Sequence, residues 1–273
     1  MFVSNDGEKM KNINVKNLKL GKNVVIEPTA VIRGISGQAD TVEIGDNTYI
    51  GHDVQIICDN VKIGDYTKIH HHTNIHGYKP CTIGHNSWIG QYCIIDTIGG
   101  TTIGNNCGIG AHSQLWSHIK YGDTLEGCRF LSDSPLNVGN DVWFVGHCII
   151  SPITAEDKSM ALVGSVVTRD MKLNHVYAGS PAKDLTDKLG NQFEEVNIDV
   201  KYKKMTEYLH EYNPSNKNIV IVKNKDQIDF SDKTKTYFDV SSRSYTKTCS
   251  DEEISFMNFL LPARAKFVPF MEK

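Results

Sequence analysis

An aliphatic side chain recurs at every sixth position over long stretches between residues 44 and 165. Glycine usually follows it, and a small or β-branched residue stands four positions after it. Such repetition constrains a fold strongly, because each repeat can bury its apolar side only against its neighbours. Eleven pairs share this pattern: Ile44/Thr48, Ile50/Val54, Ile63/Thr67, Ile69/Thr73, Ile83/Ser87, Ile89/Cys93, Ile103/Cys107, Ile109/Ser113, Val138/Val142, Phe144/Cys148 and Ala161/Ser165.

The repeat predicts a triangular coil of about eighteen residues, with three faces that each end in a tight corner. The aliphatic residue fills the interior, and the following glycine is expected to provide the backbone angles of the corner. The small residue points into the interior of the coil, close to one of its three faces. Each short strand then pairs with the coils above and below it, as in a parallel sheet. An α/β fold is disfavoured because residues 24–170 lack helical periodicity.

Composition limits the possible partners. The chain has 273 residues, and its 40% hydrophobic content can fill the core of one large domain with a small appendage. With 29 basic and 32 acidic residues, it lacks the overall basic field that attracts nucleic acid or anionic membrane. No apolar stretch has the length of a signal peptide or a membrane span, so we expect a cytoplasmic protein.

The seven cysteines are scattered without CxxC spacing, which argues against a disulfide framework and a thiolate zinc site. Cys93, Cys107 and Cys148 occupy small inward positions of the repeat. We therefore expect them to be buried thiols that act as small hydrophobic side chains.

Breaks in the repeat define the expected domains. Residues 1–23 form a lead-in, residues 24–190 the coiled domain, and residues 191–273 a small α+β appendage. Short corner loops are expected at 33–41 and 76–82, and a long excursion at 119–137, where function tends to reside. The appendage is expected to contain helices at 199–212 and 251–261 and strands at 219–222 and 236–240. We find no chemical motif in it.

Three segments, NDVWFVG, VGSVVTRD and AGSPAK, lie between Val138 and Lys183. Together with the repeat, they resemble the hexapeptide-repeat acetyltransferases, a family that includes galactoside, maltose and xenobiotic acetyltransferases. The resemblance covers residues 24–190. It implies a left-handed parallel β-helix, an all-β solenoid, here with the α+β appendage. It also implies a homotrimer with clefts between neighbouring prisms and acyl transfer from acetyl coenzyme A or another acyl coenzyme A.

In that family a histidine precedes the extended loop, and His118 occupies this position. An alcohol or protonated amine is a poor nucleophile near neutral pH, and an imidazole can accept its proton during attack on a thioester. A backbone N–H would stabilise the oxyanion. The expected reaction is direct O- or N-acylation of a sugar, nucleotide-sugar or similar polar acceptor in a ternary complex, without a metal.

The resemblance also places the pantetheine arm of coenzyme A along a groove that requires small residues. Arg169 and Lys183 are expected to meet the phosphates, although both could be ordinary solvated charges. Val145 and residues 155–160 depart from the family pattern, and Gly90 or Gln91 replaces its acceptor-binding asparagine. The expected cofactor residues are Trp143, Gly146, Gly164, Ser165, Thr168, Arg169 and Lys183.

The stretch IHHHTNIHG, with four histidines from His70 to His76, allows a rival interpretation. A protein resembling the gamma-class carbonic anhydrases would bind zinc through His76, His112 and His118, with water at the fourth position. The long loop and the NDVWFVG and VGSVVTRD segments favour coenzyme A instead. Adjacent histidines on a strand also point in opposite directions and cannot all meet one ion. A third possibility is a non-catalytic scaffold that uses the flat faces.

Overall fold

The computed structural model describes residues 12–261 and 263–270. The chain divides into two compact units, one ending at Phe193 and the next beginning at Glu194. None of the described helices is long and apolar enough to cross a membrane.

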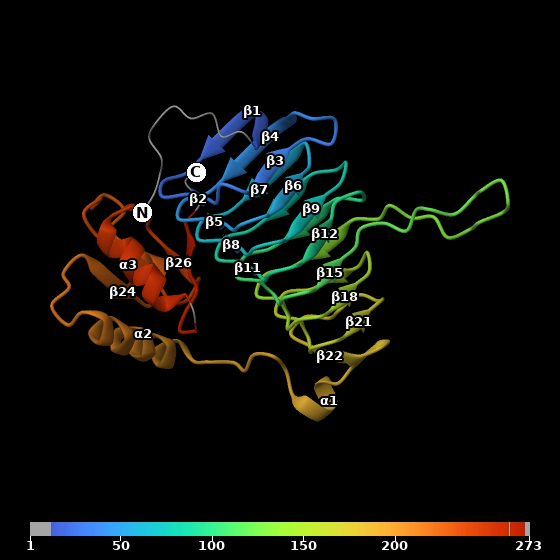
Figure 1. The fold of residues 1–273 in the computed structure, drawn as a ribbon. Coiled ribbons are helices and arrows are strands. Elements are labelled where there is room, and N and C mark those ends of the chain that lie inside the picture. Colours follow the sequence, from blue (N-terminus) through green and yellow to red (C-terminus); the bar gives the residue numbers. More distant parts are fainter. Residues whose placement is uncertain (1–11, 262, 271–273) are drawn as a thin grey trace. The chain divides into compact units, whose positions relative to one another are not determined.

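The first unit is a left-handed parallel β-helix with three faces, which we name A, B and C (Figure 1). Face A contains β3 (Val31–Arg33), β6 (Gln55–Ile57), β9 (Asn74–His76), β12 (Ile94–Asp96), β15 (Gln114–Leu115), β18 (Ile149–Ile150) and β21 (Val166–Val167). Face B contains β4 (Ala39–Ile44), β7 (Asn60–Ile63), β10 (Cys81–Ile83), β13 (Thr101–Ile103), β16 (Leu136–Val138) and β19 (Thr154–Ala155).

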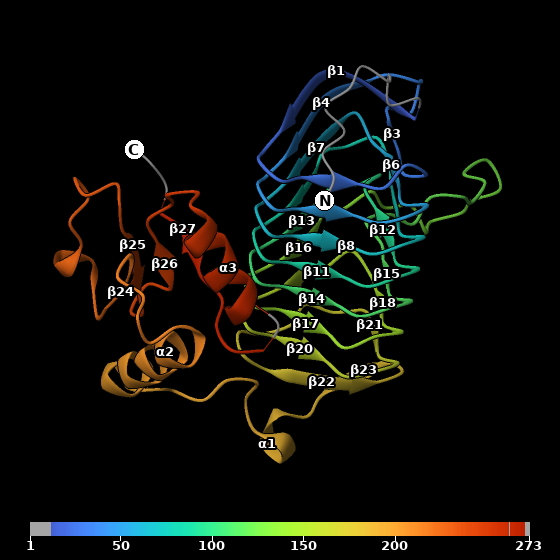
Figure 2. The ribbon, with the colours of Figure 1, turned by 60° about the vertical axis from the view of Figure 1, so that its left-hand side comes forward.

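Face C contains β2 (Val25–Ile26), β5 (Tyr49–Ile50), β8 (Lys68–Ile69), β11 (Trp88–Ile89), β14 (Gly108–Ile109), β17 (Trp143–Phe144) and β20 (Met160–Ala161). Figure 2 shows these strands stacked one beneath another. The last coil continues this face as the antiparallel pair β22 (Val176–Gly179) and β23 (Ala182–Asp184), and the short helix α1 (Thr186–Leu189) follows. The predicted fold class is therefore confirmed.

Burial confirms the six-residue pattern. All eleven predicted pairs are buried, including Cys93, Cys107 and Cys148, which have no exposed surface. They supply the inward side chains of faces B and C. A third inward set belongs to face A, so that each coil contributes three aliphatic residues spaced by six, as at Ile44, Ile50 and Ile56. The members of this third set are Ile32, Ile56, Ile75, Ile95, Leu115, Ile150 and Val167.

The glycine after the aliphatic residue is needed for a different reason from the one expected. Positive φ angles do not occur at these glycines but further into the corner, at residues such as Asn47 and His72. At Gly104, for example, an added Cβ would lie only 2.5 Å from the carbonyl oxygen of Gly139 in the next coil. Glycine is therefore required by the close approach of successive coils.

Side chains also form a hydrogen-bonded ladder along the corner between faces B and C. Asp65 Oδ1 accepts from the N–H of Asp46 (2.8 Å), and His85 Nδ1 accepts from the N–H of Asp65 (2.9 Å). Asn105 and Asn140 repeat this bond in the next coils, at 2.8 and 2.9 Å. His85 thus has a structural role, because its ring accepts a hydrogen bond from a buried coil backbone.

The stack begins earlier than expected. β1 (Ile13–Leu20) lies in the predicted lead-in but pairs with both β3 and β4, so it opens faces A and B. The predicted corner loop at 33–41 is also partly strand, since β4 starts at Ala39. Residues 1–11 of the predicted lead-in lie outside the described residues.

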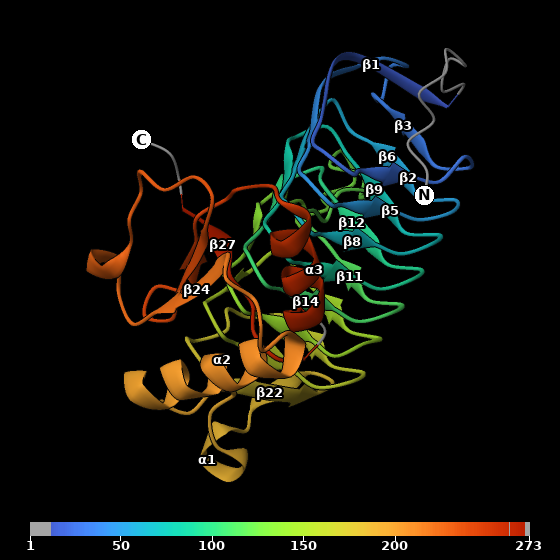
Figure 3. The same ribbon diagram turned by 90° about the vertical axis from the view of Figure 1, so that its left-hand side faces the viewer.

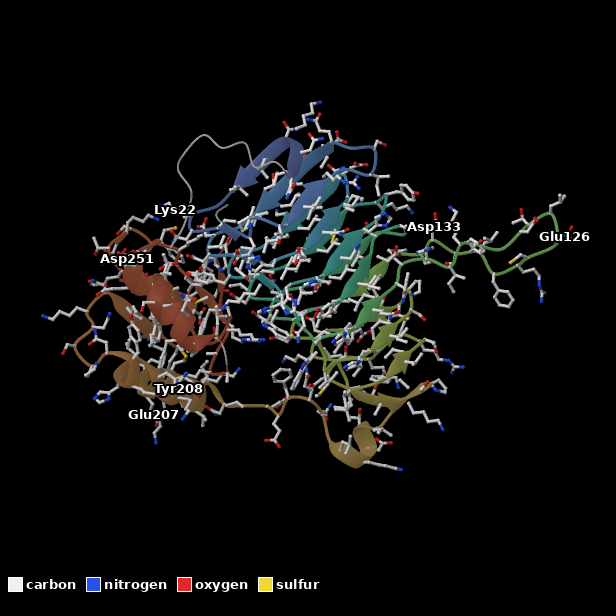
Figure 4. All side chains as sticks on the ribbon, viewed as in Figure 1. Lys22, Glu126, Asp133, Glu207, Tyr208 and Asp251 are labelled. Carbon is white, nitrogen blue, oxygen red and sulfur yellow. The ribbon has the colours of Figure 1, made fainter. Side chains whose placement is uncertain are left out.

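Residues 119–135 form a projecting arm (Figure 1), and the predicted excursion at 119–137 ends two residues too late because β16 begins at Leu136. Ile119 and Ser132 exchange backbone hydrogen bonds of 2.7 and 2.8 Å, which close the base of the arm. Figure 4 shows Glu126 at its tip and Asp133 close to the coils. Tyr121, Leu125 and Phe130 are largely exposed along the arm.

The second unit contains a four-stranded sheet in the order β24 (Ile219–Val222), β25 (Thr236–Asp239), β26 (Ser244–Tyr245) and β27 (Val268–Pro269). Figure 3 shows its helices, α2 (Ile198–Tyr212) and α3 (Asp251–Leu260). A 3-10 turn spans Lys225–Gln227. Phe238 and Phe256 are fully buried and pack edge to face. α2, β24, β25 and α3 coincide with the four segments expected from the sequence.

Candidate active site

His118 lies just after β15, at the corner between faces A and B where the arm begins. Its Nδ1 atom is 2.8 Å from Oδ2 of Asp96, the last residue of β12 in the preceding coil. The side chain of His118 is 19% exposed and that of Asp96 only 5%. A buried carboxylate therefore holds an imidazole that solvent and ligands can still reach.

Two further donors meet the same carboxylate oxygen. Asp96 Oδ2 accepts from the backbone N–H of Ser117 (2.9 Å) and from its hydroxyl (2.6 Å). A carboxylate bonded to Nδ1 selects the tautomer with the proton on that atom, which leaves the Nε2 lone pair free. Trp116 lies edge-on to the ring of His118, with 6.0 Å between ring centroids. His118 can therefore accept a proton at Nε2.

The sequence reasoning identified His118 but missed Asp96. The signal lay in the repeat frame, because Ile95 pairs with Leu115 and Asp96 is therefore level with Trp116, two residues before His118. Predicting the contact between Asp96 and His118 requires the local coil length, which varies. It is twenty residues here (95 to 115) and seventeen between Val138 and its partner Ala155.

The expected cofactor residues occupy three different places. Gly146 and Gly164 meet at the corner between faces C and A, where the N–H of Gly164 donates to the carbonyl of Gly146 (2.9 Å). Thr168 and Arg169 follow β21 at the same corner as His118, two coils further along. Trp143, which is 47% exposed, lies on the outside of face C. Lys183 is exposed on β23.

Ser165 differs from the others because it is fully buried. Its hydroxyl donates to the carbonyl oxygen of Leu162 (2.5 Å), and its N–H bonds the same oxygen (3.3 Å). Its side chain therefore forms part of the corner, and its cofactor role stays a prediction.

A column of stacked rings runs along the corner between faces C and A. His72, Tyr92, His112 and His147 occupy equivalent left-handed positions in successive coils. Their neighbouring ring centroids are 4.8, 5.1 and 4.8 Å apart. Gly164 takes the next position, also left-handed at φ 71°, and no atom lies within 4 Å of an added Cβ. The column thus ends in an open space beside His147.

The three histidines of the zinc interpretation are not brought together in one chain. His112 stacks between Tyr92 and His147, whereas His118 lies at the other edge of face A, bonded to Asp96. His76 ends β9 and is register-paired with Asp96. Within 12–261 and 263–270, no group of three or more His, Cys, Asp or Glu residues is arranged to hold a metal ion.

Comparison with known proteins finds stretches of sequence similarity to acetyltransferases. No family model matches it. It is 42% identical over 50 residues to the galactoside O-acetyltransferase of Escherichia coli (strain K12), covering 18% of this chain and 25% of that protein. It is 29% identical over 116 residues to a protein of Schizosaccharomyces pombe described as an acetyltransferase, covering 41% of this chain and 52% of that protein.

Among solved structures, a hexapeptide-repeat acetyltransferase of Vibrio cholerae complexed with acetyl coenzyme A aligns with a TM-score of 0.39 and 20% identity. The alignment covers 55% of this chain and 71% of that one. The resemblance to the hexapeptide-repeat acetyltransferases is confirmed. The chain spans a quarter of the length of the first of these two relatives and about half of the second.

Proposed function

We propose that this protein is a coenzyme A-dependent acyltransferase that acetylates a hydroxyl or amino group of a sugar, nucleotide-sugar or similar polar acceptor, acting in the cytoplasm. The observation that carries the proposal is the bond between His118 and Asp96. It places an oriented imidazole at the start of the arm, in a β-helix with sequence similarity to acetyltransferases. General base catalysis requires such a group within reach of the acceptor.

In the proposed reaction, Nε2 of His118 takes the proton from the acceptor as its oxygen or nitrogen attacks the thioester carbonyl. A backbone N–H stabilises the resulting oxyanion. The carbon–sulfur bond then breaks, and the imidazolium returns its proton to the leaving thiolate. Asp96 accepts the Nδ1 hydrogen bond throughout and stabilises the imidazolium.

A direct transfer in a ternary complex fits the cysteines of the coil better than a covalent intermediate does. Cys107 and Cys148 have no exposed surface. Burial raises the pKa of the Cys93 thiol to about 11. A thiol must be accessible to act as a nucleophile, and these three are buried.

The open space at Gly164 supports a groove for the pantetheine arm of acetyl coenzyme A. A thin, extended chain can pass where the ring column stops, close to the backbone of Gly146 and Gly164. We assign Arg169 and Lys183 to the phosphates, because both are exposed cations. Trp143 and Thr168 complete the proposed set. No residue in this mechanism requires a metal.

The separation of these groups supports a homotrimer. His118 and Gly164 lie at opposite edges of face A, so one chain does not form a single cleft from them. If the corner between faces C and A of one subunit faces the arm of the next, the base and the groove meet between subunits. The same contact would cover Tyr121, Leu125 and Phe130 on the arm.

The test compares His118→Ala with His210→Ala. Loss of the base should lower acetyl coenzyme A turnover by about a hundred- to ten-thousand-fold, the usual contribution of general base catalysis. Calorimetric affinity for coenzyme A should stay within about twofold, because His118 is placed at the acceptor. His210→Ala, which replaces an exposed histidine of α2, is the control for turnover and should retain full activity. Equal turnover in His118→Ala and the wild type would refute the proposal.

If the protein instead hydrates carbon dioxide at a zinc site, His118→Ala and His112→Ala should both remove bound zinc together with that activity. Metal analysis of the two variants therefore separates the alternatives.

A further inference from the structure

We propose that Ser117 is a positioning residue that fixes Asp96, and through it the ring of His118, for catalysis. This inference rests on the proposed role of His118 as the base. Ser117 immediately precedes His118 and is fully buried. Its position between the carboxylate and the base suits it to orient both.

The hydroxyl of Ser117 has one proton and two possible acceptors on Asp96. Oδ2 lies 2.6 Å away and the backbone oxygen 3.0 Å away. That backbone oxygen already accepts from the hydroxyl of Thr101 at 2.6 Å. The Ser117 proton is therefore directed to the carboxylate, where a charge-assisted hydrogen bond is stronger.

The oxygen of Ser117 is held from the other side as well. The N–H of Gly99, in the turn after β12, donates to Oγ of Ser117 (2.9 Å). A Cβ on Gly99 would collide with the carbonyl oxygens of Ser117 and Ser134. Only glycine lets this turn approach both ends of the arm, so the hydroxyl is clamped between a backbone donor and a carboxylate acceptor.

This clamp determines which direction the carboxylate faces. Asp96 Oδ2 receives the Ser117 N–H, the Ser117 hydroxyl and the Nδ1 donor of His118. Without the hydroxyl, the carboxylate can rotate about its last bond and carry the imidazole with it. Small displacements of a catalytic group cost large factors in rate. The loss should therefore affect kcat and leave cofactor binding unchanged.

The experiment compares Ser117→Ala with Ser113→Ala in the full-length protein. Ser113 is an equally buried serine of the same coil whose Oγ accepts from the N–H of Cys148 (3.2 Å), away from the base. Ser117→Ala should lower kcat for acetyl transfer by about tenfold with KM for acetyl coenzyme A unchanged. Ser113→Ala should keep kcat within about twofold.

A second variant tests the same positioning role if Ser117→Ala does not fold. Thr101→Val keeps the shape of the side chain but frees the Asp96 carbonyl, so the Ser117 hydroxyl can turn away from the carboxylate. We expect a decrease in kcat of about threefold. The Nδ1 proton resonance of His118, assigned by its absence in His118→Ala, should shift in Ser117→Ala and Thr101→Val but not in Ser113→Ala.

The positioning role is overturned if Ser117→Ala leaves both kcat and the Nδ1 resonance unchanged, or if Ser113→Ala reproduces its effects. Failure of the proposed function gives a different result, because His118→Ala would then also retain full turnover. The Nδ1 resonance of His118 tests the positioning role of Ser117 whether or not His118 is the catalytic base.

Discussion

Nδ1 of His118 and Oδ2 of Asp96 are 2.8 Å apart, although the residues are 22 positions apart in the sequence. The coil makes this contact possible, because one turn of twenty residues carries Leu115 back beside Ile95. The pair belongs to two successive coils. Its geometry therefore depends on the stacking register at the base of the arm.

Replacing Asp96 by asparagine should impair catalysis without disturbing the coil. An amide can present its NH₂ group to Nδ1 and favour the tautomer that blocks Nε2. We expect kcat to fall by about a hundredfold or more, with calorimetric affinity for coenzyme A unchanged. Asp53→Asn is the matched control, since Asp53 lies 3.6 Å from His72 Nε2, at the corner between faces C and A. Equal kcat in both variants would show that Asp96 does not orient the base.

Filling the space at Gly164 should close the proposed cofactor groove. Histidine tolerates the left-handed backbone, as His112 and His147 do at φ 59° and 50°. Gly164→His should therefore fold, extend the ring column and weaken coenzyme A binding by about tenfold or more. Asp53→His makes the same addition at the far end of the column and should leave affinity unchanged. If Gly164→His binds coenzyme A normally, the groove lies elsewhere.

The arm should hold the assembly together. We expect light scattering at micromolar concentration to give three times the chain mass of 30.5 kDa. Replacing Tyr121, Leu125 and Phe130 together by serine should shift the protein towards the monomer, because their apolar area would no longer favour association. Turnover should fall with the trimer. A monomeric wild type would contradict the proposed assembly.

Asp184 should make the end of the β-helix sensitive to acid. Its pKa is lowered to about 2, chiefly by the hydroxyl of Thr186 and also by His175, whose Nδ1 lies 2.7 Å away. A lowered folded-state pKa contributes stability that is present above the unfolded value near 4 and lost as pH falls towards 2. Asp184→Asn should therefore lower the melting temperature at pH 7.

Below pH 4 the difference from the wild type should shrink, and near pH 2 the two melting temperatures should converge. Glu126→Gln, at the tip of the arm, serves as the control and should change neither value. A constant difference between pH 7 and pH 2 would assign the effect of Asp184→Asn to packing.

The period of six could be predicted from the sequence because it depends on local sterics alone. A buried prism admits aliphatic side chains at one position and small ones four residues later, and Ile89 and Cys93 show this directly. The second unit was also foreseeable, since Asn213 and Pro214 end α2 and three acidic residues begin α3.

Contacts between coils could not be predicted in the same way. Asp96 reaches His118, and Gly164 continues the column of His147, only once the length of each coil is known. β1 was missed although its last residue, Leu20, pairs with Ile44 and is followed by Gly21 and by Val24, as the repeat requires. Spacing within the sequence does not encode the contacts of Asp96 and Gly164 between coils.

The most direct test of the central claim is a calorimetric titration of the purified protein with coenzyme A, with zinc measured in the same sample. The acyltransferase account predicts saturable binding of one coenzyme A per chain, whatever the zinc content. Stoichiometric zinc with no measurable affinity for coenzyme A would contradict it and favour the metal-dependent alternative.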